Sequence, residues 1–454
     1  MSTHSCVIAP HLKNSLSMAE AGKYGRMFPE LSGPKVDENI LLVLGRSGSV
    51  MDAARYGTAE TASDNPRIPA GFTFLGQFVA HDITADRSLL LHHTRLNELR
   101  NFRTPRLDLE SLYSAGPTGS PYLYDLNDAD KFLLGINDMG RMRDLPRNQQ
   151  GRALLGDPRD DVHLIISQLH LAFLKFHNAV VDFLRARGVA SADIFSSAQR
   201  LVRWHYQWIV VHEFLPLTVG EQAVQDILQH GLRWYTYDGT PSIPVEFADA
   251  AYRFGHSQVR SLYTLNDRGA QGQVFPDCAG TCPVPDERAI DWKYFFNVDA
   301  SHQPQPSKRI DTILAHSLIN LPEAVVGTTE IPEQHSLAYR DLVRNEALNL
   351  PSGEAIARVM GVTPLTANEV GLNKLGWQSE TPLWYYILRE AEVCCNGEQL
   401  GAVGGRIVAE VLLGLIAADP TSYMNADEEW QPEMPAQQTG TFTIADLLRC
   451  AGEI

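Results

Sequence analysis

Residues 72–84 read FTFLGQFVAHDIT, and their spacing decides what the centre of the fold should be. Apolar side chains recur every three to four residues in this stretch, at Phe74, Leu75, Phe78, Val79 and Ile83. That period is typical of an amphipathic α-helix rather than of a strand. Gln77 and His81 are four residues apart, so the stretch predicts a helix with both polar side chains on one face.

Helical spacing continues along most of the chain. The strongest pattern covers residues 160–185 and is followed by Gly188, and a second long helix is predicted over 196–215, ending before Pro216. Shorter helical patterns cover residues 244–263, 311–319, 334–348, 352–361, 382–395 and 402–418. Residues 101–150 are rich in Pro, Gly, Asp and Asn and predict a long irregular segment.

These patterns predict a mainly α protein with long loops and little β structure, because alternating strand patterns are scarce. No sharp break in composition divides the chain. We therefore expect residues 1–60 to form an N-terminal arm packed on the body, and residues 61–454 to form a single large domain.

Composition excludes several classes of partner. The formal net charge of −16 makes a general attraction to nucleic acids or to anionic membranes implausible. The longest apolar stretch, residues 403–418, is interrupted by Arg406 and Glu410 and is too short to span a hydrocarbon core of about 30 Å. We read it as a buried helix and expect no membrane span.

The first twenty residues contain neither a basic segment followed by a long apolar core nor a recognisable targeting helix. A cytoplasmic location is the default expectation, with leaderless secretion left open. Six cysteines in 454 residues are too few for a disulfide scaffold, so reduced structural thiols are expected. A local disulfide or weak metal site at Cys278 and Cys282 stays open as the alternative.

The chemistry cannot be read from single residues. The chain has 15 histidines, and any one of them is more often a surface or core residue than a ligand. Five segments taken together narrow the choice: FTFLGQFVAHDIT (72–84), RTPRLDLESLY (103–113), LLGDPRDD with SQLHLAFLKFHNAVV (154–181), AYRFGHSQVR (251–260) and SLAYRDLVRNEALNLPSG (336–353). In this order they resemble the animal haem peroxidases, or peroxidase-cyclooxygenase superfamily, over roughly residues 60–420. The resemblance is to a bacterial, peroxinectin-like branch.

The resemblance implies a peroxide cavity formed by three side chains. His81 would take a proton from hydrogen peroxide and return it to the departing oxygen, a form of general acid–base catalysis worth roughly 100- to 10,000-fold. Arg159 would stabilise the negative charge on the leaving oxygen, and Gln77 would hydrogen-bond the peroxide or a water. The alternative for Arg159 is a structural ion pair with Asp157, Asp160 or Asp161.

On the other side of the haem, the resemblance implies that His256 is the iron ligand and that Arg253 pairs with a haem propionate. Asp341 stands where the family commonly has Asn. A carboxylate there would make the imidazole more basic and lower the reduction potential of the iron. The alternative is an Asp341 that forms a salt bridge with Arg340 or Arg344.

Two further features follow from the resemblance. The positions that carry covalent haem links in mammalian members are Ala80, Val162 and His163 here, and none of them can form the link. We therefore expect a noncovalent haem b. The family's calcium site, which suits hard oxygen ligands, maps onto Asp82, Thr104, Arg106 through its carbonyl, Asp108 and Glu110.

The function that the resemblance implies is a peroxidase that uses hydrogen peroxide to oxidise a small aromatic, halide or pseudohalide donor. A haem-dependent dioxygenase or tailoring oxidase is the first alternative, although the position of its radical tyrosine is Arg253 here and Tyr252 is one place off. A peroxinectin-like adhesion protein is the second alternative, and no Arg-Gly-Asp tripeptide is present to favour it. The oligomeric state is left open.

Overall fold

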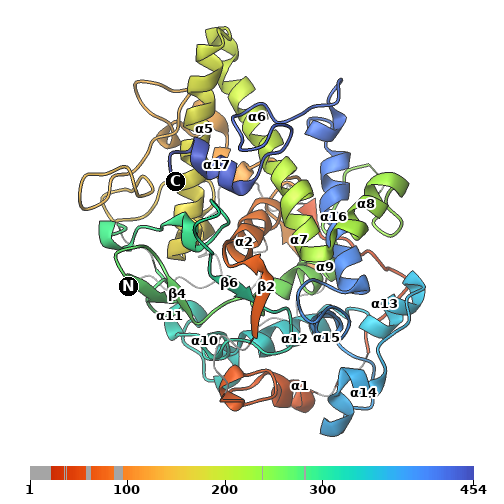
Figure 1. The fold of residues 1–454 in the computed structure, drawn as a ribbon. Coiled ribbons are helices and arrows are strands. Elements are labelled where there is room, and N and C mark those ends of the chain that lie inside the picture. Colours follow the sequence, from red (N-terminus) through yellow and green to blue (C-terminus); the bar gives the residue numbers. More distant parts are fainter. Residues whose placement is uncertain are drawn as a thin grey trace.

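The structure is a computed structural model that describes residues 22–34, 36, 38–57, 63–85, 96–237, 239–280 and 283–454. Helices dominate it (Figure 1). The longer α-helices are α1 (Glu38–Gly45), α2 (Gly71–Ile83), α5 (Leu164–Ala186), α6 (Ile194–Ile209), α8 (Glu221–His230), α12 (Leu337–Ala347), α13 (Gly353–Met360), α15 (Leu383–Cys395), α16 (Ala402–Ala418) and α17 (Ile444–Cys450). The expected mainly α fold is confirmed.

Short helices fill the connections between the long ones. They are α3 (Glu110–Tyr113), α4 (Gly116–Gly119), α7 (Leu215–Val219), α9 (Val245–Ala248), α10 (His316–Ile319), α11 (Glu323–Val326) and α14 (Ala367–Val370), with 3₁₀ turns that include η5 (Pro158–Asp161) and η8 (Ala251–His256). Between residues 101 and 150 the elements are single turns joined by irregular backbone, as the composition predicts.

The strands form antiparallel two-stranded sheets in the part of the chain that is described. β1 (Gly22–Lys23) pairs with β3 (Arg100–Asn101), and β4 (Leu262–Thr264) pairs with β5 (Gln271–Gln273). β2 (Asp64–Pro69) pairs irregularly with β6 (Pro306–Lys308), which ties the start of α2 to a distant loop. The little β structure that is present thus fixes loops rather than building a layer.

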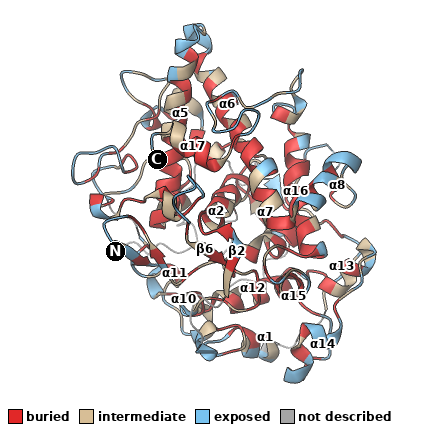
Figure 2. Cartoon of the chain, viewed as in Figure 1, coloured by how far each residue is buried: buried red, intermediate tan, exposed pale blue. Residues whose placement is uncertain are grey.

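Helix α2 lies at the centre of the molecule and is buried along most of its length (Figure 2). Its Phe78 stacks on Phe173 of α5 with ring centroids 4.6 Å apart, and both rings are fully buried. Tyr206 of α6 meets both rings edge-on. The apolar side chains whose spacing predicts α2 therefore form the face that packs on α5 and α6. This packing fixes the orientation of α2, and with it the position of the side chains on its other faces.

The structure confirms the predicted helices over residues 72–83, 352–361, 382–395 and 402–418, each to within one residue at either end. Two of the shorter predicted helices are wrong. Residues 244–263 form the turns α9 and η8 and then enter strand β4, and residues 311–319 are helical only in α10. In the first case the backbone is held by tertiary contacts, among them a buried Glu246 that accepts the N–H groups of Met27 and Phe28.

The second long helix does not end before Pro216. A π-helical turn, η7 (Val210–Phe214), follows α6, and α7 continues to Val219 with Pro216 in its first turn. Proline is tolerated there because the first N–H groups of a helical segment have no intrahelical partner. The predicted helix over 160–185 likewise divides into the 3₁₀ turn η5 and α5.

The part of residues 1–60 that is described lies against the body, where Phe28, Leu44 and Met51 are buried in the common core. The boundary at residue 60 stays a prediction. α5 is long and apolar enough to cross a membrane by length and composition, but 83% of its most apolar window is buried inside the fold, as in a core helix. Cys278 is a buried free thiol, whereas Cys282 lies outside the described residues.

We predict that Phe78→Ala lowers the free energy of unfolding by about 3–5 kcal/mol, because it leaves a cavity between α2 and α5. Denaturant unfolding followed by circular dichroism would measure the change. Leu126→Ala, at a side chain that is 96% exposed, is the control and should change stability by less than about 0.5 kcal/mol. An equal, small effect of both substitutions would contradict the packing role of Phe78.

Candidate active site

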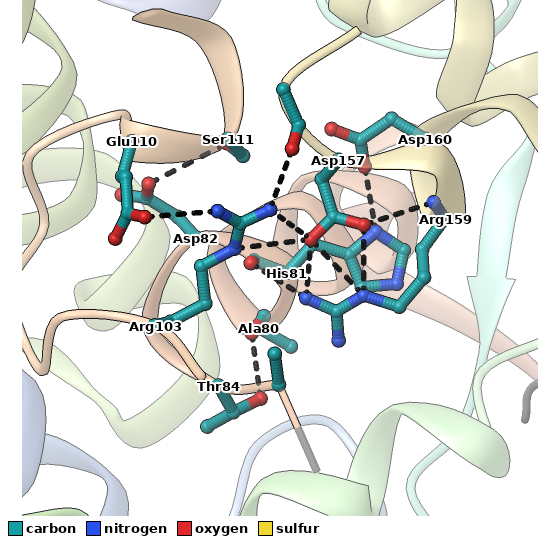
Figure 3. Close-up of polar contacts among 12 residues, drawn as sticks. Ala80, His81, Asp82, Thr84, Arg103, Glu110, Ser111, Asp157, Arg159 and Asp160 are labelled. Atoms are coloured by element: carbon teal, nitrogen blue, oxygen red, sulfur yellow. Dashed lines mark hydrogen bonds and ion pairs between the residues drawn. The ribbon is translucent and has the colours of Figure 1, made fainter. Parts of the chain in front are cut away.

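His81 projects from the last turn of α2 and is buried (Figure 3). Its Nδ1 lies 2.6 Å from Oδ1 of Asp160, a fully buried carboxylate in η5. An ionised carboxylate can only accept a hydrogen bond, so the ring nitrogen that faces Asp160, Nδ1, carries a proton. The contact thus orients the ring with Nδ1 toward Asp160 and leaves Nε2 as the nitrogen that Asp160 does not engage. Gln77, the other residue on this face, is half-buried one turn earlier.

Asp160 serves two histidines. Its Oδ2 lies 2.8 Å from Nδ1 of His170, which is buried in α5. Burial by itself raises the pKa of Asp160, but the hydrogen bonds from His170 and His81 outweigh it, so the pKa lies below its usual range. Asp160 is therefore an ionised carboxylate that fixes both rings.

Arg159 reaches the same place from the other side of η5. Its Nη2 donates to the backbone carbonyl of His81 at 2.8 Å, and its guanidinium pairs with Asp157, with Nη2 2.6 Å from Oδ2. The structure therefore brings Arg159 to His81 and also forms the ion pair that the structural interpretation predicted. A cation fixed in this way can face negative charge near His81 without moving.

Asp157 also binds a second arginine. Arg103, which is buried, places Nη2 2.6 Å from Oδ2 of Asp157 and Nη1 3.2 Å from Oε1 of Glu110 (Figure 3). Burial raises the pKa of Asp157, but Arg159 and Arg103 lower it far more, so the carboxyl is ionised. Arg103 thus connects the surroundings of His81 to the acidic loop of residues 104–110.

His256 ends the 3₁₀ turn η8, and its Nδ1 lies 2.6 Å from Oδ2 of the fully buried Asp341 in α12. Asp341 thus lies against this histidine, and its effect on a bound iron stays a prediction. No hydrogen bond joins Nε2 of His256 to any described residue, and 31% of the side chain is exposed. An imidazole whose Nδ1–H is held by a carboxylate and whose Nε2 is left over is suited to bind a metal.

Arg253 lies one turn before His256 and binds the same carboxylate, with Nη1 2.6 Å from Oδ1 of Asp341. Its Nη2 lies 2.7 Å from Oδ1 of Asp249. Burial raises the pKa of Asp341, but His256 and Arg253 outweigh this and hold it below its usual range. Arg253 therefore neutralises buried carboxylates in this structure, and its contact with a haem propionate stays a prediction.

The two histidines lie on elements that pack against each other, α2 and η8. Tyr252 of η8 lies at this contact, where its hydroxyl approaches Gly76 of α2 and its ring stacks on Phe247. The hydroxyl is buried and has no hydrogen bond among the described residues. A surface hollow with a volume of about 570 Å³ is lined by Leu262 and Phe275, among others, rather than by these histidines. A planar cavity between His81 and His256 stays a prediction.

The predicted calcium ligands gather beside α2. Thr104 donates its hydroxyl to Asp108 and to Glu110, at 3.0 and 3.2 Å, and Asp82 accepts the N–H of Leu109 at 3.0 Å. Burial, together with the charge of Asp108, raises the pKa of Asp82 well above its usual value, and burial raises the pKa of Asp108 to about 6. Crowded, buried carboxylates of this kind are stabilised by a cation. However, no three His, Cys, Asp or Glu side chains among the described residues are grouped closely enough to hold a metal ion as they stand.

Sequence reasoning missed the structural roles of Asp160, His170 and Arg103. Asp160 was considered only as a partner of Arg159, because three aspartates follow one another closely in GDPRDD and no spacing rule distinguishes them. His170 follows His163 by seven residues and lies in a strongly apolar helical pattern. The sequence signal for its role was a histidine within an apolar helical pattern that follows an acidic turn.

Comparisons with known proteins identify the family of the chain. The sequence profile of the animal haem peroxidases matches residues 91–326. Chorion peroxidase of Aedes aegypti is 24% identical over 307 residues, which cover 64% of this chain and 37% of that protein, so the chain spans little more than a third of this relative.

Among solved structures, peroxidase A of Dictyostelium discoideum superimposes with a TM-score of 0.67 at 16% identity, over 94% of this chain and 93% of that one. The fatty acid alpha-dioxygenase of Oryza sativa reaches a TM-score of 0.57 at 14% identity, over 100% of this chain and 85% of that one. The fold is thus one shared by peroxidases and dioxygenases. This chain belongs to the animal haem peroxidase family.

We predict that Asp160→Asn changes the tautomer of one of the two rings that Asp160 holds. An amide offers one accepting oxygen and one donating nitrogen, so it cannot accept from Nδ1–H of both His81 and His170. Nitrogen-15 NMR of histidine-labelled protein would show the proton moving to Nε2 in one ring. In the control, Asp161→Asn, whose carboxylate pairs with Arg147, both rings should keep Nδ1–H. Unchanged tautomers in Asp160→Asn would refute the assignment.

Proposed function

We propose that this chain is a haem-dependent peroxidase that uses hydrogen peroxide to oxidise small aromatic, halide or pseudohalide donors. The observation that carries the proposal is the pair of histidines, His81 and His256, each fixed through Nδ1 by a buried carboxylate on elements that pack together. A haem, when bound, supplies the redox centre that peroxide oxidises and the donor reduces again.

His256 would hold the iron through Nε2, since Nδ1 is already engaged by Asp341. The ionised Asp341 increases the electron density of the ring and so favours the more oxidised metal. Ala80 and Val162, which lack a carboxyl group, and His163, which lacks a thioether, leave the haem without a covalent link at these positions. These residues together favour a noncovalent haem b.

On the peroxide side, His81 would act through Nε2. The lone pair that Asp160 leaves there can remove a proton from peroxide and then deliver it to the departing oxygen. Arg159, held by Asp157 and by the carbonyl of His81, supplies a fixed positive charge for that oxygen. Gln77, one turn before His81, would orient the peroxide or a water.

Reconstituting the full chain with haemin tests this function. We expect a histidine-ligated haem absorption spectrum that changes on addition of stoichiometric peroxide. His81→Ala should slow that change by roughly 100- to 10,000-fold while haem binding survives. His256→Ala should alter the spectrum of the bound haem, and added imidazole should partly restore it.

His302→Ala, at an exposed histidine, is the matched control and should behave as the parent chain. A normal rate in His81→Ala would remove its proposed role. Uptake of oxygen with a phenol or a fatty acid in the absence of added peroxide would instead favour the dioxygenase alternative. Failure to bind haem at all would leave the adhesion alternative.

We further propose that Asp82, Thr104, Arg106, Asp108 and Glu110 bind Ca²⁺. Calcium should stabilise the fold by about 2–3 kcal/mol at a hundredfold excess over its dissociation constant, measured as a rise in melting temperature. Asp108→Asn should abolish the rise. Asp427→Asn, at an exposed carboxylate, should leave it intact. An equal response of both variants would show that calcium acts elsewhere.

A further inference from the structure

A further histidine–carboxylate pair borders the 570 Å³ hollow. His316 lines the hollow, and its Nδ1 lies 3.0 Å from Oδ1 of Asp52, which is fully buried. Asp52 is itself held by the N–H groups of Gly48 and Ala54, at 2.7 and 2.9 Å. The carboxylate therefore fixes Nδ1–H of His316 and leaves Nε2 as a hydrogen-bond acceptor on an exposed ring.

The next residue offers a second polar group. The hydroxyl of Ser317 lies in the same lining, is buried, and has no hydrogen-bond partner among the described residues. A buried hydroxyl without a partner is costly, and a bound ligand would satisfy it. The rest of the lining is largely apolar, with Leu262, Phe275 and Pro322 among its side chains.

An aromatic connection joins this hollow to α2. The ring of Phe275 meets that of His163 edge-on, with centroids 6.4 Å apart, and His163 stacks on Phe74 at 5.5 Å. Phe74 lies three residues before Gln77 on α2. Burial lowers the pKa of His163 to about 4, so this ring is neutral and packs as an aromatic group.

We propose that the hollow binds a small phenol, with its ring between the apolar walls and its hydroxyl donating to Nε2 of His316. The volume is that of a small-molecule site, which commonly measures about 300–1,000 Å³ and combines apolar walls with a few polar groups. An accepting imidazole selects a ligand with an O–H group, and Ser317 completes the hydrogen bonding.

We assign the hollow as the donor site of the enzyme, an assignment that rests on the proposed peroxidase function. Two phenols and one hydrogen peroxide give two phenoxyl radicals and two waters, so each phenol loses one electron and one proton. His316 accepts the proton at Nε2, and peroxide is the final oxidant. The aromatic contacts through Phe275, His163 and Phe74 place the electron's path toward the helix that carries His81.

The test is a titration of the full chain with phenol, with and without haemin, followed by ligand-observed NMR. Phenol should bind in both states and about tenfold more tightly than anisole, its methyl ether, which has no O–H to donate. Ser317→Ala removes a hydroxyl that has no described partner and should weaken phenol binding about fivefold. Leu262→Trp should fill the hollow and abolish binding, whereas Leu228→Trp, at another exposed leucine, should not.

His316→Phe should remove the preference for phenol over anisole, while Asp52 keeps its two backbone donors. If that variant fails to fold, Leu262→Trp and Ser317→Ala still decide the question. Phenol binding that is absent from the haem-free chain, or unaffected by Leu262→Trp, overturns the inference. Binding at the hollow in a chain that takes up no haem would overturn the peroxidase function and leave the phenol site standing.

Discussion

The hydrogen bond between a ring Nδ1 and a buried carboxylate is the interaction on which this site depends. It occurs between His81 and Asp160 and again between His256 and Asp341, at 2.6 Å in both. Each contact fixes the tautomer, the orientation and the free nitrogen of an imidazole at once. Without it, neither ring would present its Nε2 in a defined direction.

Burying these carboxylates is expensive, and the fold offsets the cost with paired charges and donors. On the side of His81, the arrangement extends outward from Arg159 through Asp157 and Arg103 to Glu110. The acidic loop is therefore joined by direct ion pairs to the residue that contacts the carbonyl of His81. A cation bound in that loop would compete with Arg103 for Glu110, so such an ion and the surroundings of His81 are electrostatically linked.

The sequence predicts α2, α13, α15 and α16 well because their apolar faces repeat at the helical period and pack on a common core. It fails over residues 244–263, where tertiary hydrogen bonds, including those to Glu246, hold short turns instead of one helix. The spacing of apolar residues along the sequence gives no information about such tertiary contacts. The same limit explains Pro216, since a π-helical turn before a proline leaves no mark in the apolar pattern.

For the site, the resemblance supplied His81, Arg159, His256 and Asp341, and the structure brings them together in two pairs. It could not supply Asp160, because choosing among neighbouring aspartates requires knowing which one the 3₁₀ turn η5 directs inward. The alternative for Asp341 invoked neighbours on its own helix, whereas its contacts come from η8, 85 and 88 residues away in sequence. Partners this distant become visible only when the elements have packed.

Burial of the carboxylate separates these pairs from ordinary histidine–aspartate contacts. Asp160, Asp341 and Asp52 have fully buried side chains, whereas the partners of His230 and His302, Asp226 and Asp299, are 29% and 47% exposed. In water, such surface pairs gain little and are free to rearrange. A buried aspartate keeps its geometry, so the histidine that it holds presents one nitrogen in one direction. The chemistry of each ring then depends on the group that lies opposite its Nε2.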